Sequence, residues 1–234
     1  MKKTITILIT IILVAFAITG CGKEKKPQYS VLLEENNAPY SQQGKEETGF
    51  IVDILKAVAE QGDFQVNLVF DMQGEYSACI NTLTDGSDSY DYTDHFYQQG
   101  IIFANSIESD ITTYEQLLHK TIGVMENSYG QDFASQIAPQ YNLTVKTYTD
   151  VEKLFKDAEE GKLDGMFEDE LVVKEQIAKG AKLKTFPNSE KTNILSFAVN
   201  KGENKEFINS FNEGYRKIVE NGTYDKILKE YTNS

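Results

Sequence analysis

The chain has 234 residues, and 36 Asp and Glu against 23 Lys and Arg give a formal net charge of −13. A nucleic-acid-binding protein needs a basic face to neutralise phosphates, so this charge argues against that class. Hydrophobic residues make up 40% and charged residues 25% of the chain, which favours a buried core over disorder. The chain has a single arginine, Arg216, although arginine is the usual two-pronged donor to carboxylates.

Residues 1–20 have the pattern of a secretory signal peptide. Two lysines at positions 2 and 3 precede a mostly apolar run over residues 5–18, and small residues follow it. The run is shorter than the roughly 20 residues that a membrane-spanning helix needs. We therefore expect a cleaved signal and a mature chain outside the cytoplasm.

The end of this segment, Ile18-Thr19-Gly20-Cys21, resembles the bacterial lipoprotein box, in which the cysteine is lipidated and becomes the first residue of the mature protein. The alternative is a plain secretion signal with an incidental cysteine. In the lipoprotein interpretation, Cys21 anchors the protein to the cell membrane and residues 21–28 form a polar tether. Loss of the two lysines changes the net charge from −13 to −15.

The first half of the mature chain alternates predicted strands and helices. Apolar periodicity indicates strands over 29–33, 65–70 and 100–104, and helices over 49–61 and 76–83. A loop rich in Ser, Asp and Tyr is expected over 86–94. Cys79 falls in the predicted helix 76–83, where we expect a buried, inert thiol.

The second half of the chain repeats this alternation. Strands are predicted over 121–125, 143–147, 165–167, 183–186 and 195–199, and helices over 114–118, 129–137, 151–160, 170–179, 205–219 and 224–231. Such alternation predicts βαβ units with largely parallel sheets covered on both faces. Two stretches with this pattern predict two α/β lobes, and the polar segment 187–192 is a candidate crossing between them.

Five segments, in order, resemble the family 3 extracellular solute-binding proteins, the polar amino-acid receptors of ABC importers. They are APY at 38–40 with GFIVDI at 49–54, TDHFY at 93–97, IGV through SYG at 122–130, GKLDGMFED at 161–169 and NGTYDKILKEY at 221–231. The resemblance covers nearly all of the mature chain. It implies a two-lobed α/β fold of the periplasmic-binding-protein type (type II), with the ligand in the cleft between the lobes and a membrane permease as partner. The implied lobe one is 29–105 with 194–234, and the implied lobe two is 106–193.

The resemblance also implies four ligand-binding residues. Glu34 and Asp169 match the first-lobe acid and the second-lobe acid that contacts the ligand's amine, and both follow an apolar strand, where α/β sheets bind ligands. Ser128 matches a residue at a helix N-terminus, which attracts anions, and Tyr40 matches the aromatic residue that stacks on the ligand. The alternatives are a solvated loop acid for Glu34 and ordinary helix N-caps for Asp169 and Ser128.

The sequence departs from the family pattern between Leu83 and Tyr92. The family has a strand there that ends in the arginine clamping the ligand's carboxylate, whereas this chain has a shorter segment rich in Ser and Asp. We therefore expect a shortened lobe one with an exposed sheet edge. Arg216, on the C-terminal helix, cannot replace the clamp, and the excess of acids favours a cationic amino acid.

Two other functions remain open from the sequence. An enzyme on the same architecture would need a base within reach of substrate, and His95 and His119 are the only histidines. A relative with impaired binding that acts as a sensor or surface protein would be consistent with the missing arginine. The spacing of His and Cys indicates no metal site, and we expect no cofactor.

Overall fold

The computed structural model describes residues 25–82 and 88–232. The predicted signal peptide and Cys21 lie outside the described residues, and so does part of the segment between Leu83 and Tyr92. Within the described part, none of the helices combines the length and the apolar character that a bilayer crossing requires.

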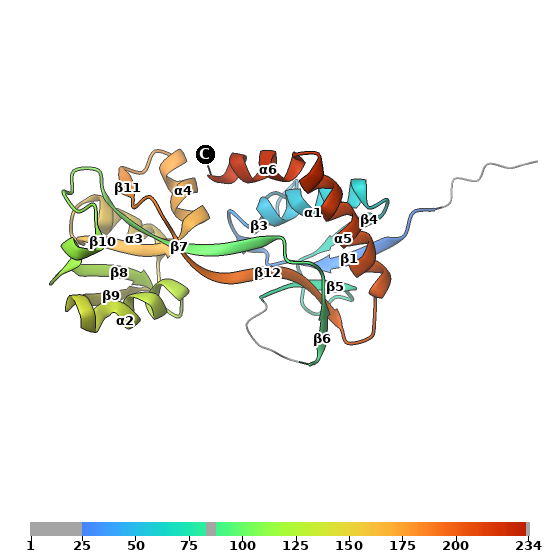
Figure 1. Ribbon diagram of the computed structural model, residues 1–234, viewed down its shortest axis with the longest axis horizontal. Coiled ribbons are helices and arrows are strands. Elements are labelled where there is room, and N and C mark those ends of the chain that lie inside the picture. The colour runs from blue at the N-terminus through green and yellow to red at the C-terminus, as the bar shows by residue number, and fades with distance from the viewer. Residues whose placement is uncertain (1–24, 83–87, 233–234) are drawn as a thin grey trace, which may run out of the picture.

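The chain folds into two α/β lobes joined by two long strands, β7 (Tyr97–Ser106) and β12 (Glu190–Asn200) (Figure 1). Lobe one contains β1 (Gln28–Leu32), β2 (Asn36–Asn37), β3 (Ser41–Gln42), α1 (Phe50–Gln61), β4 (Gln65–Val69), β5 (Ala78–Thr82), β6 (Tyr90–Tyr92), α5 (Lys205–Glu220) and α6 (Thr223–Thr232). Lobe two contains the 3-10 helix η1 (Tyr114–Leu117), β8 (Thr121–Met125), α2 (Tyr129–Tyr141), β9 (Thr144–Tyr148), α3 (Val151–Glu159), β10 (Gly165–Asp169), α4 (Glu170–Ala178) and β11 (Leu183–Thr185). The predicted two-lobed α/β architecture is confirmed.

One curled sheet runs through both lobes. Its main path follows the order β4-β1-β5-β12-β7-β10-β8-β9, with β6 added to β12 and β11 to β7. Strands β7 and β12 pair antiparallel where they cross, with Leu195 opposite Tyr97 and Glu190 opposite Ile101. The lobe boundaries 105/106 and 193/194 fall inside these two strands, so the crossing is made by sheet rather than by loops. The limits of the lobes stay a prediction.

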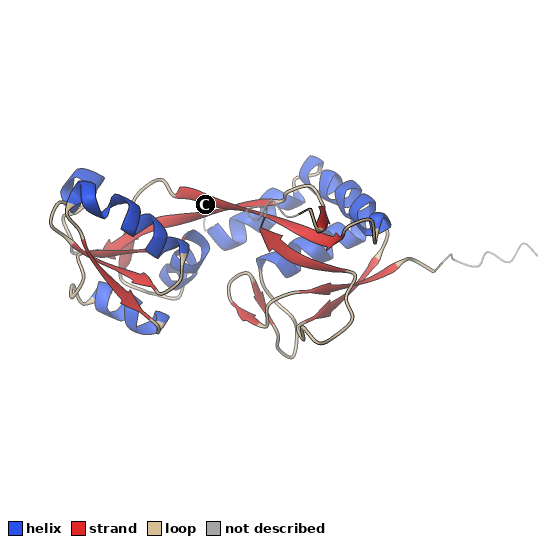
Figure 2. Ribbon diagram, turned by 90° about the horizontal axis from the view of Figure 1, so that it is seen from below, coloured by secondary structure: helices blue, strands red, loops and turns tan. Residues whose placement is uncertain are grey.

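Each lobe buries its own apolar clusters because its helices cover the sheet. In lobe one, Ile54 and Leu55 of α1 share a cluster with Phe207 and Phe211 of α5. In lobe two, helices lie on both faces of the sheet, which gives one cluster beside α3 and another beside α2 (Figure 2). Leu171 is the exception, since this residue of α4 in lobe two is fully buried in the lobe-one cluster. The lobes therefore share a hydrophobic contact beside the crossing strands.

The predicted helix over 76–83 is wrong, because Ala78–Thr82 forms strand β5. A short apolar run does not by itself distinguish helix from strand. Here the backbone of β5 pairs with β1 on one side and β12 on the other, and these hydrogen bonds decide its conformation. Cys79 therefore lies on a strand and is only partly buried, and burial raises the pKa of its thiol.

The expected loss of a central strand from lobe one is also wrong. Strand β5 lies between β1 and β12, so the sheet has no exposed edge at that position. Instead, the connection between β4 and β5 is short, spanning residues 70–77 without a helix. One smaller prediction needs correction because sheet pairing extends further than the residue pattern indicates: the expected loop 86–94 contains β6. The polar segment 187–192, the candidate crossing, leads into the crossing strand β12.

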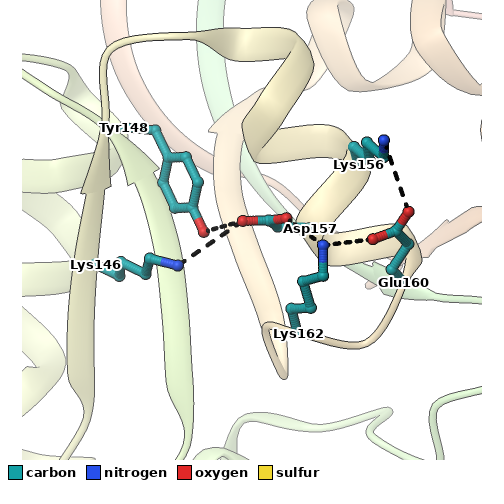
Figure 3. A network of polar contacts seen from close by, with 6 residues as sticks. All are labelled: Lys146, Tyr148, Lys156, Asp157, Glu160 and Lys162. Carbon is teal, nitrogen blue, oxygen red and sulfur yellow. Dashed lines mark hydrogen bonds and ion pairs between the residues drawn. The ribbon is translucent and has the colours of Figure 1, made fainter.

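A buried carboxylate, Asp157, ties α3 to β9 in lobe two (Figure 3). Its side chain is 7% exposed and accepts hydrogen bonds from the Tyr148 hydroxyl at 2.9 Å and from Lys162 Nζ at 3.1 Å. Lys146 Nζ lies 3.8 Å from its Oδ2 atom and 4.9 Å from the centroid of the Tyr148 ring. The Tyr148 hydrogen bond and then Lys162 hold the pKa of Asp157 below its usual value.

We expect Asp157→Asn to lower the melting temperature at neutral pH. A carboxyl with a depressed pKa stabilises the fold above its unfolded-state pKa, and this contribution is lost as the pH falls through the folded-state pKa. The difference in melting temperature between wild type and variant should therefore shrink below about pH 4. Scanning calorimetry across this range measures it, with Glu160→Gln as the exposed control of the same network. A difference that is constant with pH would contradict the assignment.

Candidate functional site

Tyr40 and Asp169 meet across the two lobes. Tyr40 lies between β2 and β3 of lobe one, and Asp169 is the last residue of β10 in lobe two. The Tyr40 hydroxyl donates to the Asp169 carboxylate, at 2.8 Å from Oδ1 and 2.7 Å from Oδ2. The structure thus brings together two residues that are 129 positions apart in the sequence and that were both predicted as site residues.

The backbone around Tyr40 explains how this side chain is held. Its carbonyl accepts a hydrogen bond from Ile51 N, and its amide donates to the Asn37 carbonyl. Gly49 packs so closely that a Cβ atom there would lie 2.5 Å from the Tyr40 carbonyl oxygen, and its φ of +127° is one that glycine adopts readily. Gly49, at the start of the 49–54 motif, thus allows the close backbone packing that holds Tyr40 in place. The Tyr40 residue is 3% exposed.

A cavity of about 320 Å³ adjoins this contact. This volume is within the range of small-molecule sites, which is roughly 300–1,000 Å³. Both lobes and both crossing strands contribute to its walls, through Glu34, Asn37, Tyr40, Ser41, Ile51, Ile80, Asn81, Gln99, Tyr129 and Leu195. The cavity lies at the junction where a hinged pair of lobes would hold a ligand.

Glu34 lines the cavity directly. It follows β1, and its Oε2 atom accepts a hydrogen bond of 2.6 Å from the Asn37 side chain. Ser41 Oγ donates to the Glu34 backbone carbonyl at 2.7 Å, which fixes the turn. The structure therefore places a carboxylate at the cavity wall in lobe one, and its role toward a ligand stays a prediction.

Ser128 is the N-cap of α2 and is not among the residues that line the cavity. Its Oγ accepts from Gln131 N at 3.1 Å and donates to the Met125 carbonyl at 2.7 Å. The adjacent Tyr129, the first residue of α2, reaches the cavity wall. The geometry of Ser128 is therefore that of an ordinary helix N-cap, and its role toward a ligand stays a prediction.

Asp169 is also an N-cap, and it is electrostatically unusual. Its Oδ1 accepts from Leu171 N at 2.9 Å, which caps α4. Burial raises the pKa of Asp169 to about 6, although the Tyr40 hydroxyl and the α4 amides oppose this shift. Burial also raises the pKa of Glu168 to about 7. Its Oε1 accepts from Asp169 N, and its buried Oε2 has no hydrogen-bond partner among the residues that the structure describes.

Eight of the ten residues that line the cavity, all but Glu34 and Tyr40, were not predicted as site residues from the sequence, and Asn81, Gln99 and Tyr129 are among them. Gln99 lies on the crossing strand β7 and lines the cavity beside Tyr40. Asn81 lies on β5, which was predicted as a helix, so its direction could not be inferred. Tyr129 directly follows the predicted Ser128, and its place at the start of a helix was the available signal.

Other candidate residues lie away from the cavity. Arg216 on α5 forms an exposed ion pair with Glu220 at 2.7 Å. His119 contacts the Asn142 amide through Nδ1 at 2.7 Å, and His95 lines a separate hollow on lobe one. In the described parts of the chain, no group of three or more His, Cys, Asp or Glu residues is arranged to hold a metal ion.

No family model matches the chain. The arginine-binding extracellular protein ArtP of Bacillus subtilis (strain 168) is 21% identical over 99% of this chain and 98% of its own length. A probable histidine-binding protein of Neisseria gonorrhoeae is 25% identical over 93% of this chain and 91% of its own. Substrate-binding domain 2 of Lactococcus lactis GlnP, in an open conformation, superposes with a TM-score of 0.81 at 29% identity, covering 90% of this chain and 97% of that domain.

The fold is that of a two-lobed periplasmic binding protein. The relatives and structural neighbours of this chain are mostly amino-acid-binding proteins or substrate-binding domains of amino-acid ABC transporters, and several of the relatives are named as extracellular or periplasmic. The fold alone is also shared with an ancestral amino-acid-binding protein described as a precursor of cyclohexadienyl dehydratase, at 21% identity and a TM-score of 0.64.

Proposed function

We propose that this chain captures a polar amino acid in the cavity between its lobes and delivers it to an ABC permease. The observation that carries the proposal is the Tyr40–Asp169 contact beside a cavity of about 320 Å³ that both lobes line. The likeness to a transporter domain in its open conformation supports an open state that closes on a ligand. Such closure follows from a ligand's higher affinity for the closed form.

The polar groups around the cavity suit the two ends of an amino acid. Asp169 is a carboxylate in a low-dielectric position and can pair with the ammonium group, with the Tyr40 hydroxyl beside it. The backbone amides at the start of α2, where Tyr129 lines the cavity, would donate to the carboxylate. Glu34 adds a second negative charge at the wall of lobe one.

We infer that the preferred ligand is cationic. The cavity wall carries Glu34, with Asp169 behind it, and none of its ten lining residues is a lysine or arginine. Among described residues, the only arginine is paired with Glu220 on α5. A ligand with a second positive group would compensate the charge of Glu34. The arginine- and histidine-binding relatives support this assignment.

A thermal-shift panel of free amino acids tests the proposal. Ligand at one hundred times its Kd stabilises the folded state by about 2.7 kcal/mol. For a chain of this size we expect a rise in melting temperature of roughly 5–10 °C. Arginine, lysine or histidine should give the largest shift, and glutamate the smallest. Flat traces for every amino acid would support a relative with impaired binding, and product formation would support an enzyme.

Binding should weaken as the pH falls below about 6, because an ammonium ligand needs the ionised form of Asp169. Burial raises the pKa of this carboxyl to about 6, so protons compete with the ligand below that value. We expect the affinity to be nearly constant above about pH 7 and to fall by up to about tenfold per pH unit below the pKa. Calorimetric titrations at several pH values measure this. An affinity independent of pH would remove Asp169 from the ammonium site.

The proposed lipid anchor is tested separately from ligand binding. Metabolic labelling with a fatty acid should mark the wild-type protein at Cys21 and leave Cys21→Ser unlabelled. Because a single acyl chain holds a protein only weakly, we expect more than one chain for stable membrane association. A wild-type protein that carries no lipid would support the plain secretion signal.

A further inference from the structure

A second hollow lies on lobe one and is lined by residues at the start of β7, on α5 and on α6. Its volume is about 490 Å³, and its polar and aromatic walls include Asp94, His95, Gln98, Tyr215 and Tyr224. It shares no residue with the cavity between the lobes. The proposed transport function leaves this hollow without a role.

Two tyrosine rings form a corner in this hollow. The rings of Tyr215 and Tyr224 are 5.7 Å apart between centroids and nearly perpendicular, at 82°. The Tyr224 hydroxyl donates to the Phe96 carbonyl at 2.6 Å, and Tyr215 stacks on Phe211 with centroids 6.1 Å apart. Both rings are therefore held in place by lobe one itself. Aromatic faces carry partial negative charge and attract cations.

Two carboxylates, Asp94 and Asp225, lie near this corner, and His95 lines the same hollow. Burial raises the pKa of Tyr215, and the negative charge of Asp94 raises it further. For Tyr224, burial, the neighbouring Tyr215 and Asp225 raise the pKa in that order. Within the described residues, neither Asp94 nor Asp225 takes part in an ion pair, whereas the neighbouring acids Glu213 and Glu220 are paired with Lys217 and Arg216. The hollow therefore combines two tyrosine rings with carboxylates that form no ion pair among the described residues, and Arg216, which lines an adjoining hollow with Asp94 and Tyr215, is paired with Glu220.

We propose that this hollow binds a small organic cation with an alkylated ammonium group, held by the Tyr215 and Tyr224 rings and by Asp94. Ring faces suit a bulky, weakly hydrated cation better than a compact metal ion, because an ammonium group with alkyl substituents loses little hydration on contact. Asp94 is exposed at the rim, where its charge attracts the cation without being buried. The site is independent of ligand capture between the lobes.

Tetramethylammonium chloride is the probe, titrated into ring-labelled protein and followed by the NMR signals of the tyrosines. Tyr215→Phe and Tyr224→Phe assign the two signals, because each keeps the ring and loses one tyrosine resonance. We expect the NMR signals of the Tyr215 and Tyr224 rings to shift saturably with tetramethylammonium concentration. These chemical-shift changes should exceed those that sodium chloride causes at equal ionic strength. Asp94→Asn should weaken binding several-fold, and Tyr215→Leu by about fivefold or more, as expected for one cation–π contact.

Two further variants separate this site from other causes. Glu206→Gln, an exposed acid on α5 that lines neither this hollow nor the adjoining one shared by Asp94 and Tyr215, should leave the affinity for tetramethylammonium unchanged. Asp169→Asn should also leave it unchanged, because Asp169 belongs to the contact between the lobes. If Tyr215→Leu fails to fold, Asp94→Asn still tests the proposal. The Asp94 side chain makes no hydrogen bond within the described residues, so this substitution should not disturb the fold. Shifts that match sodium chloride, or that disappear in Asp169→Asn, would overturn the proposal.

Discussion

Replacing Asp169 with asparagine is expected to weaken amino-acid binding by about thirtyfold or more. Removing one charge of a buried, hydrogen-bonded pair costs roughly 2–5 kcal/mol, and each 1.4 kcal/mol is about tenfold in affinity. The fold should survive, because asparagine is as good an N-cap as aspartate and its carbonyl can still accept from Tyr40 and from Leu171 N. Isothermal titration with the amino acid that gives the largest thermal shift measures the loss.

Glu175→Gln is the matched control for this substitution. Glu175 lies on α4, the helix that Asp169 caps, and its carboxylate forms an ion pair of 3.0 Å with Lys179. Neither residue lines the cavity. It should keep the wild-type affinity, which would show that a general loss of negative charge is not the cause. If Asp169→Asn binds as tightly as wild type, the carboxylate does not hold the ligand's ammonium group.

Truncating Leu171 to alanine is expected to destabilise the whole molecule. This side chain is fully buried and connects α4 of lobe two to the core of lobe one. Leu→Ala substitutions at buried positions cost roughly 2–5 kcal/mol, which for a chain of this size lowers the melting temperature by roughly 5–15 °C. Because the contact lies beside the crossing strands, its loss should also loosen the coupling between the lobes, and calorimetry should show a broader transition.

Val173→Ala is the comparison for this effect. Val173 is equally buried on the same helix, but it packs only in a lobe-two cluster. We expect it to lower the melting temperature without broadening the transition. If both variants broaden the transition equally, or if neither does, Leu171 does not couple the lobes.

The sequence was a good guide to the architecture because its helices have long, regular apolar faces. The pattern over 49–61 predicted α1 to within one residue at its start, and the alternation of elements predicted two lobes. It was a poor guide where sheet pairing decides the structure. Ala78–Thr82 became a strand because β1 and β12 lie on either side of it, and such long-range neighbours are invisible to a local pattern.

The candidate site was predictable only in part, for a related reason. Tyr40 and Asp169 lie in motifs that resemble a family, and the structure places them in contact. Gln99 and Asn81 reach the cavity because of the register of β7 and β5, and one residue of slip would turn either side chain away. Glu168 Oε2 is buried and has no hydrogen-bond partner among the described residues. The acidic run at 168–170 does not by itself reveal that this side chain is buried.

A crystal structure grown with the amino acid that gives the largest thermal shift tests the central claim most directly. We predict a ligand between the lobes, with its ammonium nitrogen within about 3 Å of the Asp169 carboxylate and its side chain directed toward Glu34. An empty cavity at saturating ligand, or a ligand that contacts neither Tyr40 nor Asp169, would contradict the account.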